Sequence, residues 1–410
     1  MRAGHLEQRV LVFVTLGLVA FGLVMVYSAT SAAAALGNGD PMTYLKRQAV
    51  YAFLGVVLMA AASRVDYHRL RYLAPPLVLV ALGLCAAVLV VAPEINGARR
   101  WFILGPASFQ PSELAKLALC LFAAVYLARR RPPQTLGELA RPLGLLTALF
   151  CGLILLEPDL GTTITLCGTM LAIFVAAGVP LRVVTTAALL AGGLAAAAIW
   201  IEPYRRARLL SFLDPWSDAQ GDGFQIVQAM IGIGSGGITG SGLGEGVQKV
   251  LYLPEAHTDM IFAVVGEELG LVGSLFVIGA FAAFAVAGFR VALGCRDRFG
   301  KLLAAGITAL VSGQATINLA AVLGIAPLTG IPLPFVSYGG SSLVVFLAAV
   351  GVLLNIAVNG EVARARVPDR SRRDRGSRAA RARGGRGARG ARRAGDVRRV
   401  ARPRRVASGS

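Results

Sequence analysis

The feature that most constrains this chain is a series of apolar stretches, each close to the length needed to cross a lipid bilayer. A helix needs about 20 residues to span the hydrocarbon core. Hydrophobic residues make up 56% of the 410 residues and charged residues only 15%. The candidate spans are residues 10–29, 48–63, 72–92, 112–128, 143–156, 160–178, 183–201, 260–289, 303–324 and 338–358. The sequence therefore predicts an all-α polytopic membrane protein with about ten transmembrane helices.

The positions of the basic residues predict which side of the membrane each connection faces. Lysine and arginine in short loops favour the cytoplasmic side. With the N-terminus inside, the inner connections hold most of these residues, including Arg64, Arg129 and Arg290. An even number of spans then places both termini in the cytoplasm. The one long outer loop, residues 202–259, falls between the seventh and eighth spans.

Residues 361–410 differ in composition from the rest of the chain, which we assign as one membrane domain, residues 1–360. They hold 18 arginines and four acidic residues, and so contribute +14 of the formal net charge of +19. Repeated Gly, Ala and Arg cannot bury a core, which predicts a disordered cytoplasmic tail. Its arginines suit anionic membrane lipid. Nucleic acid is disfavoured as a partner, because no aromatic residue lies among them.

The outer loop at residues 95–116 places positive charge beside the start of a span. Arg99 and Arg100 oppose the inside preference, and Trp101 is typical of the membrane interface. These residues either rest in the lipid headgroups or bind an anion. Lys116 follows the predicted helix start by one turn, where a charge in the apolar zone costs about 2.5–3.5 kcal/mol. The structural alternative to a binding role is a side chain that reaches outward to the surface.

The fifth and sixth spans are separated only by Glu157, Pro158 and Asp159. This spacing predicts a tight helical hairpin with a polar tip. Asp159 could cap the second helix by accepting hydrogen bonds from its first N–H groups. Two carboxylates that flank a proline at the outer surface could instead bind a cation or a sugar. The spacing leaves both interpretations open.

The long outer loop contains two predicted helices and a glycine-rich run. Arginines up to Arg208 precede an amphipathic stretch around residues 209–212, which predicts a helix lying in the membrane interface. Residues 224–233 predict a second apolar helix. The glycines at 232–246 contain a GxGxxG match, but no βαβ unit surrounds it, which excludes a dinucleotide site. They favour a turn that lets the backbone approach a ligand or a neighbouring helix.

Residues 251–270, LYLPEAHTDMIFAVVGEELG, combine a histidine and four carboxylates with the start of the eighth span. Read as a helix from Asp259 onward, this stretch places Asp259 above a face of very small side chains. Such a face is either a tight helix contact or the floor of a groove. Glu267 and Glu268 are expected near the outer edge of the membrane or facing a wet cavity, since the residues after them already span it.

Metal binding is an alternative for the carboxylates and the histidine of this stretch. Glu255, His257 and Asp259 could share an ion, but their two-residue spacing would require an extended segment. The five cysteines lie in or beside apolar spans and show no CxxC spacing, so we interpret them as buried thiols. The last outer loop, residues 327–342, interleaves prolines and glycines at membrane depth. Such backbone is tolerated where it is buried in protein or lines a cavity, and we favour the cavity wall.

These stretches together resemble the SEDS family of shape, elongation, division and sporulation proteins. The matching residues are RRWF with QPSELAK, EPDLGTT, FLDPW with GFQIVQAM, IGSGGITGSGLG, QKVLYLPEAHTDMIFAVVGEELG and PLPFVSYGGSS. The resemblance extends over nearly the whole chain, to about Asn355, and is closer to the division-type branch than to the elongation-type branch. Met260 replaces a phenylalanine that is usual in the family, but it keeps an apolar side chain there.

The resemblance implies a peptidoglycan glycosyltransferase that polymerises lipid II on the outer face of the bacterial inner membrane during septal cell-wall synthesis. The aspartate of the family's HTD motif, its presumed catalytic base, falls on Asp259. The implied partners are a class B penicillin-binding protein with transpeptidase activity and other division proteins. No cofactor is implied, and assistance by a divalent cation is left open.

The substrate of such an enzyme leaves as a lipid pyrophosphate, which basic groups would stabilise. The candidates for contact with the substrate are Arg47, Arg100 and Lys116 for the pyrophosphate, with Asp159, Glu255, His257 and Ser337 as further contacts or supports. The alternatives are an elongation-type polymerase, a scaffold that activates its partner, and a flippase or transporter of lipid-linked sugars. A transporter would show a charged path near the midplane and often inverted repeats. Here the charges gather at the outer end.

Overall fold

The computed structural model describes residues 3–35, 41–95, 97–105, 107–250, 253 and 256–365; the tail predicted to be disordered lies outside these residues beyond its first few. Ten helical spans in this part are long and apolar enough to cross a membrane, which confirms the predicted class. Nine of them are α1 (Ala3–Ala35), α2 (Pro41–Arg64), α3 (Leu70–Val91), α4 (Pro111–Arg129), α7 (Leu160–Ala177), α8 (Leu181–Ile201), α11 (Ile261–Gly294), α12 (Arg298–Val322) and α13 (Gly340–Ala365). The tenth joins α5 (Leu136–Leu139), η2 (Ala140–Gly144) and α6 (Leu145–Leu156).

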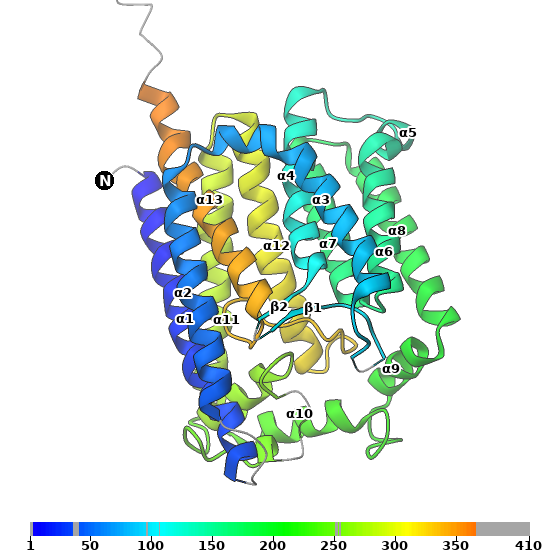
Figure 1. Cartoon of the computed structure of the whole chain (residues 1–410), viewed down its shortest axis with the longest axis vertical. Helices are drawn as coiled ribbons and strands as arrows, with labels where there is room; N and C mark the ends of the chain where they lie inside the picture. Colours follow the sequence, from blue (N-terminus) through cyan, green and yellow to red (C-terminus); the bar gives the residue numbers. More distant parts are fainter. Residues whose placement is uncertain are drawn as a thin grey trace, which may run out of the picture. The chain divides into compact units, whose positions relative to one another are not determined.

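The shorter elements gather mainly at one end of the helix bundle, which we call the loop end (Figure 1). The loop end carries β1 (Phe102–Leu104), β2 (Ala107–Phe109), α9 (Pro203–Leu213), α10 (Phe224–Ser235), η3 (Gln248–Val250) and the connection from α12 to α13. The helices α9 and α10 confirm the two predicted in the long outer loop. The antiparallel hairpin of β1 and β2 was not predicted. At the opposite end lie η1 (Tyr67–Arg69), the start of α1 and the end of α13.

Local signals in the sequence set several helix ends. The Asp297 carboxylate caps α12 by accepting a hydrogen bond from the Gly300 N–H, since the first N–H groups of a helix have no partner within it. Pro111 stands in the first turn of α4, where a missing N–H costs nothing. Gly178 ends α7 with φ of 80°, a conformation that favours glycine. The polar hairpin tip between α6 and α7 forms as predicted.

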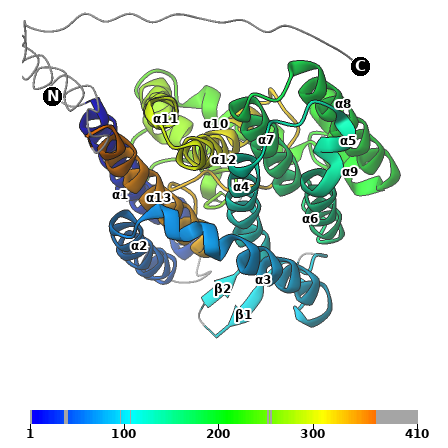
Figure 2. The same cartoon turned by 90° about the horizontal axis from the view of Figure 1, so that it is seen from above.

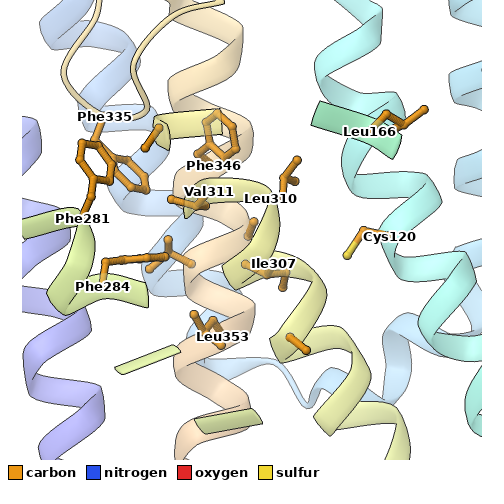
Figure 3. Packing of buried hydrophobic residues seen from close by; sticks show 14 of the residues in the cluster. Cys120, Leu166, Phe281, Phe284, Ile307, Leu310, Val311, Phe335, Phe346 and Leu353 are labelled. Carbon is orange, nitrogen blue, oxygen red and sulfur yellow. The ribbon is translucent and has the colours of Figure 1, made fainter. Parts of the chain in front are cut away.

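The core is centred on α12, which packs against α4, α7 and α11 (Figure 2). Apolar side chains of these helices and of α13 fill the space between them (Figure 3). The ring of Phe335, from the loop before α13, lies 6.0 Å from that of Phe284 and 6.1 Å from that of Phe346. The loop before α13 is therefore anchored in the hydrophobic core through Phe335.

The helix α11 is broken at Gly270, where the backbone has φ of 63° and ψ of −155°. This break corrects the expectation of one regular helix through the eighth span. The N–H groups of Leu271 and Val272 donate instead to the carbonyls of Gly237 and Ile238, at 2.9 and 3.2 Å. The glycine-rich run after α10 thus packs directly against the break, as the prediction of a close approach to a neighbouring helix required.

The small-residue face of α11 is covered by protein. A Cβ atom on Gly266 would lie 2.9 Å from Ile233 Cγ1, and one on Gly270 would lie 2.5 Å from the Gly240 nitrogen. Real Cβ atoms do not approach other atoms so closely, so a side chain at Gly266 would displace Ile233, and Gly270, which meets backbone at a positive φ, requires glycine. Of the two interpretations left open by the sequence, the tight helix contact is confirmed.

Candidate active site

Asp259 lies at the loop end in a turn over residues 256–260, and α11 begins two residues later, at Ile261. The expected helix start at Asp259 was therefore wrong. The backbone carbonyl of Asp259 accepts a hydrogen bond of 2.8 Å from Nδ2 of Asn318, which comes from α12. The side chain of Asp259 is half-buried, and the Thr258 hydroxyl donates to its Oδ1 atom at 3.3 Å. The turn is thus held from outside α11.

The loop before α13 approaches the carboxylate of Asp259. The same Nδ2 atom of Asn318 donates to the Ile331 carbonyl at 2.9 Å, so one amide joins this loop to the turn. A Cβ atom on Gly330 would lie 4.0 Å from Oδ2 of Asp259 and 4.0 Å from Nη1 of Arg208. A carboxylate and a guanidinium, from the turn before α11 and from α9, therefore converge beside Gly330.

Asp159 caps α7, as one of its two predicted interpretations required. Its Oδ1 atom accepts from the Thr162 N–H at 2.9 Å, and its Oδ2 atom accepts from the Thr162 hydroxyl at 2.7 Å. The Gln110 side chain also donates to Oδ2, at 3.3 Å. Asp159 is buried and fully engaged with protein donors. Its contact with a substrate stays a prediction.

Gly161 explains why the tip of this hairpin meets the loop before α13. A Cβ atom on Gly161 would lie 2.5 Å from Ile331 Cγ2 and 2.7 Å from the Thr329 carbonyl oxygen. No larger residue fits without moving backbone. The first turn of α7 therefore supports the segment that carries Gly330.

The side chain of Arg100 binds the backbone of the same hairpin tip. Its Nε atom donates to the carbonyl of Glu157 and its Nη2 atom to the carbonyl of Pro158, both at 2.7 Å. The carboxyl of Glu157 is fully buried, and neither of its oxygens has a hydrogen-bond partner within the described chain. Burial raises the pKa of Glu157 to about 8, the Asp159 carboxylate adds to the shift and Arg100 opposes it.

Lys116 is buried and paired within the protein. Its Nζ atom lies 2.9 Å from Glu113 Oε1 and 2.6 Å from Gln314 Oε1, and 5.2 Å from the centre of the Phe346 ring. Gln314 in turn donates to the Pro332 carbonyl at 2.9 Å. The Lys116 side chain therefore does not reach outward to the surface, and its charge is not exposed. Loss of one partner from such a buried pair costs about 3–5 kcal/mol, which makes Lys116 a structural support below the loop.

His257 packs among aromatic side chains at the loop end. Its ring centre lies 5.0 Å from that of Tyr44 and 5.5 Å from that of Tyr338. Its backbone carbonyl accepts a hydrogen bond from the Tyr338 N–H at 2.9 Å. Burial raises the pKa of Tyr338, and a hydrogen bond from the exposed Arg47 side chain opposes the shift. Arg47 therefore lies beside the cluster of Tyr44, His257 and Tyr338. Of these residues, His257 is two positions before Asp259 in the chain.

Ser337 is buried in the loop before α13. Its hydroxyl accepts a hydrogen bond from the Leu333 N–H at 2.8 Å, and its carbonyl accepts one from Gln48 at 3.1 Å. Leu333, Phe335 and Val336 are buried as well. This part of the loop is therefore packed in protein. Such packing is the alternative to the cavity wall that was favoured from the sequence.

Glu267 and Glu268 are buried, with 4% and 0% of their surface exposed, so neither carboxylate faces a wet cavity. Their position near the outer edge of the membrane stays a prediction. The carboxylate of Glu267 accepts hydrogen bonds from backbone N–H groups at the start of η3, and Glu268 pairs with Lys249. Their partners are 19 and more residues away along the chain, so this pairing had no local signal in the sequence.

Glu255 lies outside the described residues, so its predicted role as a support stays a prediction. Among the residues that the structure does describe, no three side chains of His, Cys, Asp or Glu are grouped so that they could hold a metal ion.

Two features of the site escaped the sequence analysis. Arg208 is one of the arginines that precede the predicted interfacial stretch, and nothing in the sequence pattern distinguishes it from Arg206. Asn318 and Gln314 carried a signal, because two amides four residues apart on one face of an apolar span must both find partners there. Both indeed hold the loop before α13 through its backbone carbonyls.

The fold and the site define a class: a membrane protein with ten candidate spans among its described residues, which brings a carboxylate and a guanidinium together at one end of the bundle. The model of the Cell cycle protein family, which comprises FtsW, RodA and SpoVE, matches residues 8–361. The chain belongs to this family, which confirms the resemblance found in the sequence.

Curated relatives and solved structures agree with this assignment. "Probable peptidoglycan glycosyltransferase FtsW" of Geobacter metallireducens is 41% identical over 351 residues, which cover 85% of this chain and 94% of the relative. "Stage V sporulation protein E" of Bacillus subtilis is 39% identical over 351 residues, with 85% and 96% covered. A chain from a peptidoglycan synthase complex that coordinates polymerization and crosslinking is 37% identical, with a TM-score of 0.71 over 85% of this chain and 97% of that chain. Thermus thermophilus RodA is 34% identical, with a TM-score of 0.63 over 85% and 96%.

Proposed function

We propose that this peptidoglycan glycosyltransferase polymerises lipid II at its loop end, with Asp259 as the general base. The observation that carries the proposal is the convergence of the Asp259 carboxylate and the Arg208 guanidinium beside Gly330. Family membership supports it, as do relatives that are named peptidoglycan glycosyltransferases.

The reaction joins a sugar hydroxyl of one substrate to the anomeric carbon of another. The base takes the proton of the incoming 4-hydroxyl, the oxygen forms the new glycosidic bond, and the bond from the anomeric carbon to the pyrophosphate breaks. A positioned carboxylate is suited to the first task, which typically contributes about 10²–10⁴-fold. Asn318 binds the main chain of Asp259 and so fixes the base through its backbone.

The leaving pyrophosphate needs positive charge where its own charge develops. Arg208 is suited to this role because its Nη1 atom and the carboxylate of Asp259 lie at equal distance from the Gly330 position. Arg100 and Lys116 are engaged with the hairpin tip and with Glu113, so we assign them to the support of the site. Arg47, exposed beside Tyr338, is suited to a more peripheral contact. The proposed steps need no cofactor, and a divalent cation on the pyrophosphate is tested by adding a chelator.

The proposed setting is the division septum, with the loop end on the outer face of the inner membrane. The basic residues of the opposite-end connections support this orientation under the positive-inside rule. A structural neighbour from a complex of polymerization and crosslinking supports a class B penicillin-binding protein as the partner. Other division proteins and anionic lipid would complete the assembly.

The direct test uses the purified full chain with its penicillin-binding partner in liposomes that contain fluorescent lipid II. The wild type should form glycan polymer, and Asp259→Asn should lower the rate about 10²-fold or more. Asp222→Asn, an exposed carboxylate of the same outer loop, serves as the control and should keep the wild-type rate.

Other outcomes would separate the alternatives. Polymer formation by Asp259→Asn at the wild-type rate would remove Asp259 as the base. Movement of lipid II between leaflets without polymer would establish the transporter instead. A fluorescent fusion along the side wall rather than at the septum would assign the elongation-type role.

A further inference from the structure

A buried ion pair joins η3 to α11 and α1. Nζ of Lys249 lies 2.5 Å from Oε1 of Glu268, and the two side chains are 1% and 0% exposed. The Ser28 hydroxyl, from α1, donates to Oε2 of Glu268 at 2.6 Å and accepts from Lys249 at 3.1 Å. Two charges so deep in the protein must be paired, because an isolated buried charge carries a large desolvation cost.

The residue before Glu268, Glu267, binds the start of η3. Oε1 of Glu267 accepts from the Val247 N–H at 2.6 Å and from the Gln248 N–H at 3.1 Å. Hydrogen bonds from backbone N–H groups to a carboxylate are short, strong and directional. Glu267 therefore holds the backbone at the start of η3, and Glu268 holds the side chain of Lys249 in η3.

The anchored segment precedes the Asp259 turn in the sequence. Lys249 and Glu268 are 19 residues apart, and Asp259 lies in the loop that their ion pair closes. The far side of this loop is held by Asn318 at the Asp259 carbonyl and by Tyr338 at the His257 carbonyl. The chain is thus held at η3, before the turn that carries the candidate base, and again at the turn itself by Asn318 and Tyr338.

We propose that Lys249 is a positioning residue, which fixes the Asp259 turn relative to α11 and α1 through its buried ion pair with Glu268. The inference rests on the proposed function only for its catalytic consequence. An apolar pair of equal volume would fill the same space, but it would not hold η3 at one register. The charged pair is therefore assigned to geometry rather than to stability, since buried ion pairs add little net stability over well-packed apolar side chains.

The test compares Lys249→Met with the double variant Lys249→Met/Glu268→Gln. The single variant leaves a buried carboxylate unpaired, whereas the double variant removes the ion pair without leaving a charge. Hydrogen–deuterium exchange over residues 246–260 should rise in both. In the liposome assay, kcat should fall about 10–100-fold in the folded double variant, as expected for a displaced catalytic group, while KM for lipid II changes less than about threefold.

The control is Arg71→Met/Asp297→Asn, which removes a partly exposed ion pair of 2.9 Å at the opposite end. It should leave kcat and the exchange of residues 246–260 as in the wild type. A Lys249→Met/Glu268→Gln protein with wild-type kcat and wild-type exchange would overturn the inference. If the wild type itself forms no polymer, the proposed function fails. The exchange data then still decide whether Lys249 holds the segment.

Discussion

The Nδ2 atom of Asn318 donates a hydrogen bond of 2.8 Å to the backbone carbonyl of Asp259. The contact uses the main chain of the candidate base, so it fixes the position of Asp259 without occupying its carboxylate. Because Asn318 also binds the Ile331 carbonyl, one side chain sets the distance between the turn and the loop before α13.

Replacement of this amide should uncouple the two segments. Asn318→Leu leaves two carbonyls without their donor, at a cost of about 1–3 kcal/mol, and should lower the rate of glycan polymerisation about tenfold or more. Asn355→Leu is the matched control, because Asn355 is an equally buried amide that joins Ser63 to Tyr67 at the opposite end. It should lower the thermal midpoint in detergent while the rate per folded molecule stays unchanged. Equal rate losses in both variants would argue against a specific role for Asn318.

Arg208 should matter far more than its neighbour Arg206. Removal of a donor that stabilises developing charge typically costs about 10²–10³-fold in rate, so Arg208→Ala should reduce polymer formation to that degree. Arg206→Ala removes an exposed arginine of the same helix and should have little effect. The comparison is made by initial rates at saturating lipid II. If both variants retain activity, another cation must serve the pyrophosphate.

Gly161 should tolerate no side chain. Gly161→Ala forces a Cβ atom into Ile331 and the Thr329 carbonyl, which should cost about 1–3 kcal/mol and displace the loop that carries Gly330. Gly168→Ala, on the same helix with no atom near its Cβ position, should be neutral or stabilising. Thermal unfolding and polymerisation rates are measured together. A fully active Gly161→Ala protein would show that the loop can move without consequence.

Glu157 should make stability depend on pH. Folding raises the pKa of this carboxyl from 4.5 to about 8, so the folded protein holds a proton that the unfolded chain releases. Its contribution is fully present below the lower value and is lost as the pH rises through the higher one. The wild type should therefore become less stable than Glu157→Gln as the pH rises from about 5 to about 8. Thermal midpoints across this range check the prediction, with Glu245→Gln, an exposed carboxyl, as the control. Parallel curves for the wild type and Glu157→Gln would refute it.

The number of spans was predictable because apolar length is a local property of the sequence. The helix hairpin at Pro158, the helices α9 and α10, and the close approach of the glycine run all followed from local patterns as well. The two short strands did not, since three residues of alternating pattern carry almost no signal. The break at Gly270 was also missed, because the apolar pattern continues through it.

Most of the site depends on partners that are distant in sequence. Lys116 was expected to bind an anion or reach the surface, and its pairing with Gln314 joins residues 198 positions apart. Glu268 meets Ser28 across 240 positions. Such contacts arise from the tertiary packing of α1, α4, α11 and α12, which local periodicity does not encode. The role of Asp259 as the base was implied by the resemblance, while its contact with Asn318 became evident only from the packing.

Because the rings of Tyr44 and Tyr338 lie beside His257, the NMR signals of this histidine should report on the loop end. Aromatic rings displace the resonances of nearby protons, and the size of the displacement changes steeply with distance. The chain has only three histidines, so isotope labelling of this residue type yields a short spectrum, in which His257→Gln identifies the relevant signal. One ring comes from α2, one from the loop before α13, and the imidazole from the turn of Asp259. The arrival of a substrate that parts these three segments could thus be followed in the unmodified protein.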